Sequence, residues 1–171
     1  MRRLLLLALL SLYACTLRGQ DRAIGQHITS EPWIFWVVNE SKESYKMAAT
    51  NSDLLYFDTG QKATTLIVSL WESGYVMVCL QQTKGLFTTD PIGDSITCRF
   101  DDGPYHQYPI DRSKDGTKHF IGIFRAKDFY DNLVYTKKLM IRAIFDDGPK
   151  WMVFQVAGFN MNLLHIKNDQ W

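Results

Sequence analysis

Residues 64–81 read TTLIVSLWESGYVMVCLQ, and this stretch decides the predicted fold. Its two apolar runs, 64–71 and 75–81, are short and rich in β-branched and aromatic residues, which is typical of buried β-strands. The intervening Glu72, Ser73 and Gly74 suit a tight hairpin turn. The stretch therefore predicts two neighbouring antiparallel strands.

Six further runs of the same kind lie on both sides of this hairpin. They are residues 33–39, 45–50, 95–100, 119–124, 139–145 and 151–157. Only residues 126–134 and 160–166 have helical character. In the first segment Phe129 and Leu133 lie four residues apart on one face, and Asn160 is expected to cap the second. We predict an all-β domain: an antiparallel β-sandwich, or partly open barrel, of about eight strands with one or two short accessory helices.

A five-residue sequence, Phe-Asp-Asp-Gly-Pro, occurs twice, at residues 100–104 and 145–149. In both copies it follows a predicted strand. Asp favours turns, Gly supplies a positive φ and Pro stops further strand pairing. We therefore expect the same turn in both places. A pair of acidic loops that bind a cation or a partner is the alternative interpretation.

The size and composition of the chain predict one folded domain. It has 171 residues, of which 46% are hydrophobic and 22% charged, as in ordinary globular proteins. Nineteen Lys and Arg against eighteen Asp and Glu give a net charge of +1. No overall field would attract nucleic acid or an anionic membrane surface, so nucleic acid is not expected among the partners.

The first residues have the pattern of an export signal. Arg2 and Arg3 precede the apolar run 4–12, which is too short to span a bilayer that needs about 20 residues. Residues 12–15 read Leu-Tyr-Ala-Cys and resemble the bacterial lipobox, whose Cys receives lipid. We predict residues 1–14 as a signal peptide and Cys15 as the lipidation site.

The predicted domain organisation follows from that anchor. Residues 15–31 are expected to form a lipid-anchored N-terminus and tether, and residues 32–171 a single β-sandwich domain. In lipoproteins an Asp after the Cys favours retention at the inner membrane, whereas this chain has Thr16. We expect an outer-membrane lipoprotein that faces the periplasm. Ordinary signal cleavage, giving a soluble periplasmic or secreted protein, is the alternative.

The three cysteines fit an exported protein. If Cys15 carries lipid, Cys79 and Cys98 remain as a candidate disulfide between two strands. Two buried free thiols are the alternative, because Cys packs as a small apolar residue. Neither Cys79 nor Cys98 has another Cys or a His two to four residues away, so a zinc site is not expected.

Four tryptophans are candidates for a partner surface. The run 33–38 is apolar on both faces, and a buried core strand is the simpler interpretation. The alternative is that one face of this run forms a surface for a protein partner. The residues of that candidate surface are Trp33, Trp36, Trp71 and Trp151.

Catalytic motifs are absent from the sequence. None of the histidines has the spacing of a metal site or a catalytic dyad, and no nucleophile-elbow, zinc-protease or phosphate-loop motif occurs. We predict a protein that is not an enzyme and has no metal and no cofactor. The remaining catalytic hypothesis is a hydrolase that uses His106 or His119 with Asp111.

One segment partly matches a calcium-binding loop. Asp111, Ser113 and Asp115 stand at positions one, three and five before Gly116, as that loop requires. The twelfth position is Gly122, where a bidentate Glu is needed. A polar connection between strands is the preferred interpretation.

The order of several segments resembles that of two groups of small bacterial envelope proteins. These segments are Trp33, the strand 45–50, the Arg-Phe-Asp sequence at 99–101, the strand 139–142 and residues 154–159. The groups are the invasion-associated locus B-like proteins and the accessory proteins associated with type VI secretion. The resemblance implies an exported envelope protein and supplies no catalytic residues.

From these observations we expect an exported bacterial lipoprotein with a non-catalytic binding or assembly role in the cell envelope. Its partner would be an envelope protein, and its membrane contact would be the N-terminal lipid only. An accessory role in secretion is compatible with the resemblance. The alternative is an envelope inhibitor or immunity protein that inserts the loops 84–93 and 101–115 into a hydrolase or toxin.

Overall fold

The computed structural model of the chain describes residues 24–30, 32–39, 44–52, 64–82, 87, 95–112, 119–145 and 148–163. The predicted signal peptide and Cys15 lie outside these residues. Within them, neither helix has the length and apolar character needed to cross a membrane.

The described residues form one antiparallel sheet in the order β1-β2-β3-β4-β5-β8-β7-β6-β9-β10. No described pairing joins β1 to β10, so the sheet is open. The strands are β1 (Ile24–Ser30), β2 (Trp33–Asn39), β3 (Ser44–Asn51), β4 (Thr64–Trp71), β5 (Val76–Gln82), β6 (Ser95–Phe100), β7 (Tyr105–Arg112), β8 (Phe120–Ile123), β9 (Lys138–Phe145) and β10 (Gly148–Gln155). The predicted all-β fold is confirmed.

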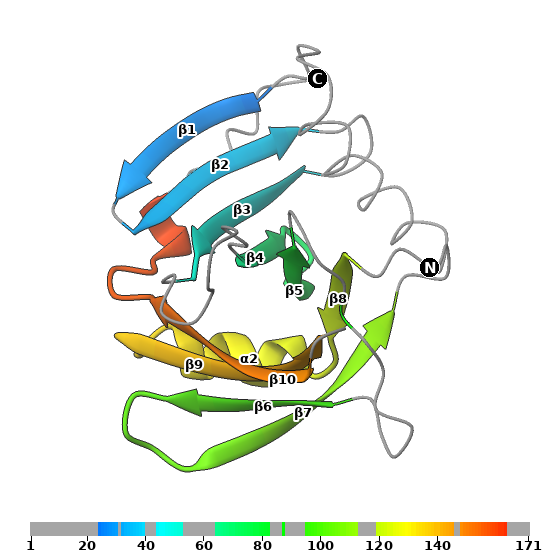
Figure 1. Cartoon of the computed structure of the whole chain (residues 1–171). Coiled ribbons are helices and arrows are strands. Elements are labelled where there is room, and N and C mark those ends of the chain that lie inside the picture. Colours follow the sequence, from blue (N-terminus) through cyan, green and yellow to red (C-terminus); the bar gives the residue numbers. More distant parts are fainter. Residues whose placement is uncertain are drawn as a thin grey trace.

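The sheet curls so that one face encloses the main core. Figure 1 shows β1, β2 and β3 on one side and β6, β7, β9 and β10 on the other. Trp33 of β2 is fully buried, and its indole Nε1–H donates a 3.0 Å hydrogen bond to the carbonyl of Val156, just after β10. The Trp33 ring also lies 4.7 Å from that of Phe159. These contacts hold the two sides of the sheet together.

Strand β7 joins the two parts of the sheet because it changes partner along its length. Its residues 105–109 pair with β6, whereas residues 110–112 pair with β8. Pro109 lies at the change, where a residue without an N–H interrupts the ladder at little cost. We infer that the partner switch at Pro109 directs the sheet around the core.

Helix α2 (Ala126–Leu133) carries the chain from β8 to β9, past β7 and β6. It buries Phe129 and Leu133, which lie four residues apart and hence on one face, as predicted. The short 3₁₀ helix η1 (Met161–Leu163) follows β10. The amide N–H of Asn162 donates to Oδ1 of Asn160, so the expected cap is present.

Two strands correct the predicted organisation. Residues 24–30, expected in the tether, form β1 and pair with β2. Residues 105–112, expected to belong to a loop, form β7. The sequence obscures β1 because its polar residues gain a partner strand only through tertiary pairing, and it obscures β7 because Pro109 interrupts the run.

The predicted hairpin between β4 and β5 is confirmed. The N–H of Trp71 donates to the carbonyl of Tyr75 at 3.0 Å, and that of Gly74 to the carbonyl of Trp71 at 2.9 Å. Gly74 has φ +79°, a conformation that glycine adopts without steric cost.

The two copies of the Phe-Asp-Asp-Gly-Pro sequence differ in the conformation of their glycines, contrary to the expected shared turn, while residues 146–147 lie outside the described chain. After β9 the expected residue, Gly148, has a positive φ of 110° and already pairs with Phe145. After β6 the positive φ belongs to Asp101, at 49°. Gly103 is needed there for space, because a Cβ would lie 3.0 Å from the Phe100 carbonyl oxygen. Because the local sequence is the same in both copies, the different glycine conformations follow from the surrounding strands.

The candidate disulfide does not form: Cys79 and Cys98 are both free and buried. Cys98 belongs to the main core inside the curled sheet. Cys79 belongs to a second cluster with Tyr45, Met47 and Ile67, whose side chains alternate with those of the main core. The two thiols therefore lie on opposite faces of the sheet, and a disulfide requires Cβ atoms that face each other.

Burial raises the pKa of both thiols above the usual range. In a variant with Cys15→Ala, we expect no alkylation by iodoacetamide at pH 8 in the folded state and two adducts in urea, because only the thiolate reacts. The raised pKa of each thiol contributes stability that is fully present below the unfolded thiol pKa of about 8.5. The free energy of unfolding should therefore fall as the pH rises above that value. Intact mass measures both labelling states. A mass two hydrogens lower, without adducts in urea, would reveal a disulfide.

Candidate functional site

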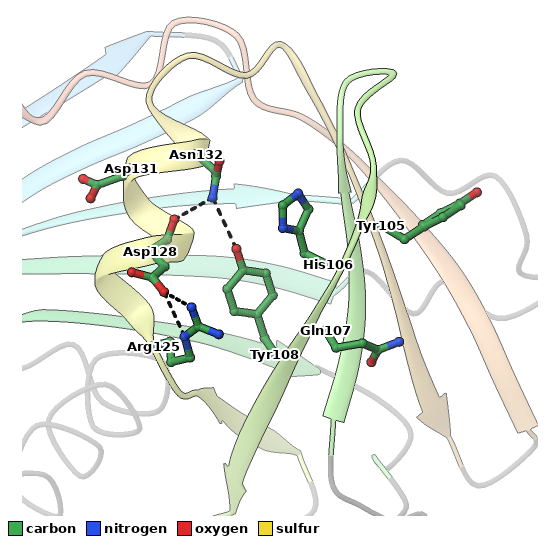
Figure 2. A pocket seen from close by; sticks show the side chains of 8 residues that line it. All are labelled: Tyr105, His106, Gln107, Tyr108, Arg125, Asp128, Asp131 and Asn132. Atoms are coloured by element: carbon green, nitrogen blue, oxygen red, sulfur yellow. Dashed lines mark hydrogen bonds and ion pairs between the residues drawn. The ribbon is translucent and has the colours of Figure 1, made fainter.

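A polar groove of about 520 Å³ lies between β7 and α2. From β7 it is lined by residues 105–108, and from α2 by Arg125, Asp128, Asp131 and Asn132. Figure 2 shows His106 and Tyr108 directed toward the helix, and Tyr105 directed away from it. We call this site the β7–α2 groove.

The base of the groove is a packed aromatic cluster. The rings of Phe100 and Tyr108 each lie 5.3 Å from that of Phe129, both at interplanar angles of 70°. His106 meets the Phe100 ring edge-on at 5.7 Å. Edge-to-face contacts stabilise such clusters and fix ring orientations. His106 and Tyr108 are therefore held in defined positions at the groove.

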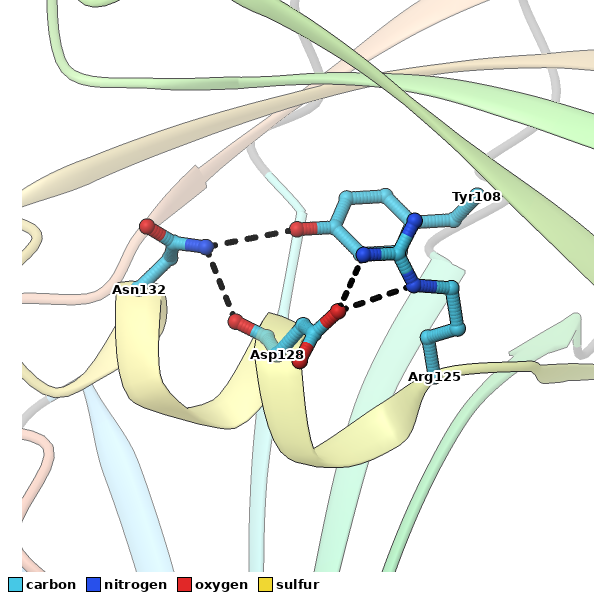
Figure 3. A network of polar contacts seen from close by, with 4 residues as sticks. All are labelled: Tyr108, Arg125, Asp128 and Asn132. Carbon is cyan, nitrogen blue, oxygen red and sulfur yellow. Dashed lines mark hydrogen bonds and ion pairs between the residues drawn. The ribbon is translucent and has the colours of Figure 1, made fainter.

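A hydrogen-bonded network connects the two walls (Figure 3). The amide Nδ2 of Asn132 donates to the hydroxyl oxygen of Tyr108 at 3.4 Å and to the main-chain carbonyl of Asp128 at 2.8 Å. Nε of Arg125 donates to the Asp128 carboxylate at 2.8 Å. The network presents a guanidinium, a carboxylate, an amide and a phenol within one site.

Arg125 has a special position at the start of α2. It is the N-cap residue, it has φ 58° and ψ 38°, and its side chain does not cap the helix by a hydrogen bond. A left-handed conformation is uncommon for a residue with a Cβ and costs free energy. Here the ion pair with Asp128 holds the guanidinium at the groove. Strained residues of this kind cluster at functional sites.

The electrostatic environment of the groove is mixed. Desolvation by burial raises the pKa of Tyr108, and the hydrogen bond from Asn132 partly opposes this shift. The phenol stays protonated at neutral pH, so it can both donate and accept a hydrogen bond. Lys127 pairs with Asp131, which also lines the groove. The groove thus offers donors and acceptors without a dominant charge.

The four candidate tryptophans do not form one surface. Trp33 is fully buried in the main core, so its assignment to a partner surface is wrong. Trp36 and Trp71 pack against the second cluster, on the other side of the sheet from the main core. Trp151 lies on β10 beside Tyr105, with ring centroids 5.8 Å apart. An apolar run read in one dimension cannot show these separate faces.

The catalytic pairing of His106 with Asp111 is wrong. The two residues lie five positions apart on β7, and successive strand side chains point to opposite faces. Asp111 is exposed, whereas the His106 ring packs against Phe100. His119 lies in the turn before β8, and Gly122 of that strand is the register partner of Asp111. The partial calcium-loop match falls mostly in residues 113–118, outside the described chain.

Sequence reasoning missed most residues of the groove. Arg125, Asp128 and Asn132 match no motif, and only the fold of α2 over β7 brings them near Tyr108. One signal was available in the sequence: Tyr108 and Ile110 alternate with Gln107, Pro109 and Asp111. That alternation is typical of a half-buried strand and would have identified β7.

The chain is thus an all-β protein whose curled antiparallel sheet carries one groove-lining helix. No protein-family model matches it, and no curated protein matches it either. Among solved structures it is similar to the crystal structure of invasion associated protein B from Bartonella henselae, with a TM-score of 0.55 and 15% sequence identity. The match covers 81% of this chain and 92% of that chain. At this identity the likeness establishes the fold, in agreement with the resemblance seen in the sequence.

Proposed function

We propose that the chain is an exported bacterial lipoprotein whose all-β domain binds an envelope protein through the β7–α2 groove. The observation that carries this proposal is the groove itself: a rigid aromatic base beneath polar groups of both signs. Recognition sites commonly combine fixed aromatic side chains with a few placed polar groups. The fold shared with an invasion associated protein is compatible with a role in the envelope.

Export is supported by the first residues rather than by the fold. The pair Arg2 and Arg3, the apolar run and the lipobox-like sequence ending at Cys15 favour cleavage before Cys15 and lipid attachment to it. Without residues 1–14 the chain keeps 17 of its 19 basic residues and all 18 acidic ones. Such a nearly neutral domain is consistent with lipid, not charge, as its link to the membrane.

The anchor is tested by intact mass. We expect the protein from bacterial membranes to lack residues 1–14 and to carry the added mass of a diacylglyceryl group at Cys15. The variant Cys15→Ala should lose that mass and leave the membrane fraction, because the attached chains supply the membrane affinity. A Thr16→Ala variant serves as the control and should keep the lipid. Unprocessed protein in the cytosol would contradict export.

Binding through the groove is tested by pull-down from envelope extract. The double variant Arg125→Gln, Tyr108→Phe removes two groups of the network and should reduce recovery of the partner about tenfold or more, as expected for a central polar contact. The matched control is Lys137→Gln, Tyr135→Phe, which likewise removes one positive charge and one phenolic hydroxyl, at exposed positions. Circular dichroism verifies that both variants fold.

The outcomes separate the hypotheses. Equal recovery by the two double variants would locate the partner elsewhere on the molecule. Recovery of one hydrolase in equimolar amount, with loss of its activity, would favour the inhibitor alternative. In that case the turn at residues 101–104 is a candidate for insertion into the target, because it is the exposed end of the hairpin formed by β6 and β7.

A further inference from the structure

The face of β7, β6, β9 and β10 that points away from the core carries a second cluster of interaction groups. Alternation along these strands places Arg99, Tyr105, Arg142 and Trp151 on it. Tyr105 is 61% exposed, and Arg142 is also exposed. We call these four residues the outer arginine face. Its side chains leave β7 on the side opposite to His106 and Tyr108, and it meets the β7–α2 groove at Tyr105 and the neighbouring Gln107, which border both sites.

This face carries two aromatic rings that lie close together. Tyr105 and Trp151 stand on β7 and β10, which are separated by β6 and β9. Three interstrand spacings amount to roughly 14 Å, yet the two ring centroids are 5.8 Å apart. Both side chains must therefore reach toward each other over the intervening strands. The ring planes are inclined to each other by 46°, so the pair forms an angled aromatic platform, and the apolar face of a ligand ring can pack on either ring.

The charge of this face is positive. The paired segments 95–100, 105–109, 138–145 and 148–155 contain no Asp or Glu. The Arg99 guanidinium lies 5.4 Å from the Tyr105 ring centroid and donates to the carbonyls of Asp102 and Gly103, which fix its position. Its nearest described carboxylate, on Asp102, is exposed and 3.8 Å away. Planar guanidinium groups bind carboxylate and phosphate groups in bidentate geometry.

Arg142 stands between the aromatic platform and the side chains of Ser95, Thr97 and Gln107, which we call the hydroxyl row. Its register partners are Thr97 on β6 and Trp151 on β10. Within the described part of the chain, the guanidinium of Arg142 makes no hydrogen bond or ion pair, unlike that of Arg99. Beside it, Gln107 donates to the Thr97 hydroxyl at 2.9 Å and accepts from the Ser95 hydroxyl at 3.2 Å. These neutral groups are donors and acceptors suited to ligand hydroxyls.

We infer that the outer arginine face binds an acidic carbohydrate. The apolar face of a sugar ring packs on Tyr105 or Trp151, and its carboxylate or phosphate pairs with Arg142. The sugar hydroxyls form hydrogen bonds with the hydroxyl row. A nucleic acid is disfavoured, since strand binding needs a cation for many successive phosphates and the whole chain has a net charge of only +1. An acidic protein segment is also disfavoured, because it would leave the hydrogen-bonding groups of the hydroxyl row unused.

The test is calorimetric titration of the full chain with a galacturonic acid hexamer and with its methyl ester, which has the same rings without charge. We expect binding of the acid that weakens with salt and no binding of the ester. Arg142→Gln should weaken binding about tenfold or more, whereas Lys127→Gln, the same charge loss on α2, should change it less than about twofold. Trp151→Ala, verified by thermal melting, should also weaken it.

Several results would overturn the inference. These are equal binding of the ester, tighter binding of a thymidine dodecamer or a poly-glutamate peptide, and absence of binding by the acid. Loss of binding in the groove variant Arg125→Gln, Tyr108→Phe, but not in Arg142→Gln, would also overturn it, because the sugar would then occupy the groove. The envelope pull-down tests the groove separately, so failure of one proposal leaves the other standing.

Discussion

Replacing Trp33 by Ala is expected to lower the free energy of unfolding by about 3–5 kcal/mol, the range for an aromatic residue removed from a packed core. Trp33 is fully buried, and it contacts both Phe35 and Phe159 through its ring. Its indole N–H also satisfies the carbonyl of Val156, on the far side of the curled sheet. The variant leaves a cavity and an unpaired carbonyl at the place where β2 meets the chain after β10.

The measurement is urea unfolding followed by circular dichroism, because the substitution removes a fluorophore. Ile34→Ala is the matched control: this neighbour is 44% exposed, and its loss should cost less than about 1 kcal/mol. Trp33→Phe keeps most of the ring but loses the hydrogen bond, and should cost about 1–3 kcal/mol. Similar stability of the Trp33→Ala and Ile34→Ala variants would contradict this account of how the sheet is held in its curled form.

Asp101→Ala is expected to destabilise the fold by about 2–3 kcal/mol, from two lost hydrogen bonds and a strained backbone. The Asp101 carboxylate Oδ1 accepts hydrogen bonds from the amides of Lys137 and Lys138, at 3.0 and 2.8 Å. It thereby joins the turn after β6 to the start of β9. Its φ of 49° lies in the left-handed region, which Asp and Asn tolerate better than Ala.

Asp102→Ala is the matched control, since it removes the same charge from the next residue of the same turn. The Asp102 side chain is fully exposed and lies 3.8 Å from Arg99, so its loss should leave the free energy of unfolding nearly unchanged. Asp101→Asn keeps Oδ1 and should cost less than half as much as Asp101→Ala. Thermal melts of the three variants check the order, and equal effects at residues 101 and 102 would refute the proposed role.

The accuracy of the predicted strands depends on how much of each strand's signal is local. The strands at residues 33–39, 64–71 and 95–100 have the predicted bounds, because their apolar and β-branched residues favour a strand in any context. In β1 and β7 polar residues and Pro109 weaken that signal. These strands form because neighbouring strands pair with them, which is a contact across the sheet rather than a local preference.

The candidate site follows the same division. The sequence predicted α2 from the spacing of Phe129 and Leu133, but it did not indicate that the polar side of this helix would face β7. It also did not show on which faces Cys79 and Cys98 lie, since that depends on the position of each strand in the curled sheet. The number of cysteines in the chain is compatible both with a disulfide and with two free thiols.

The sequence by itself determined the all-β class, most of the strands, the turn at residues 72–74 and the helix α2, because period-two alternation, turn residues and helical spacing act over a few neighbouring positions. Tertiary structure alone decided the partner switch of β7 at Pro109, the burial of Trp33, the separation of the two thiols and the meeting of Arg125, Asp128, Asn132 and Tyr108. Each of these depends on pairing between residues far apart in the chain, where the free energy of burying a shared core selects the register and the face.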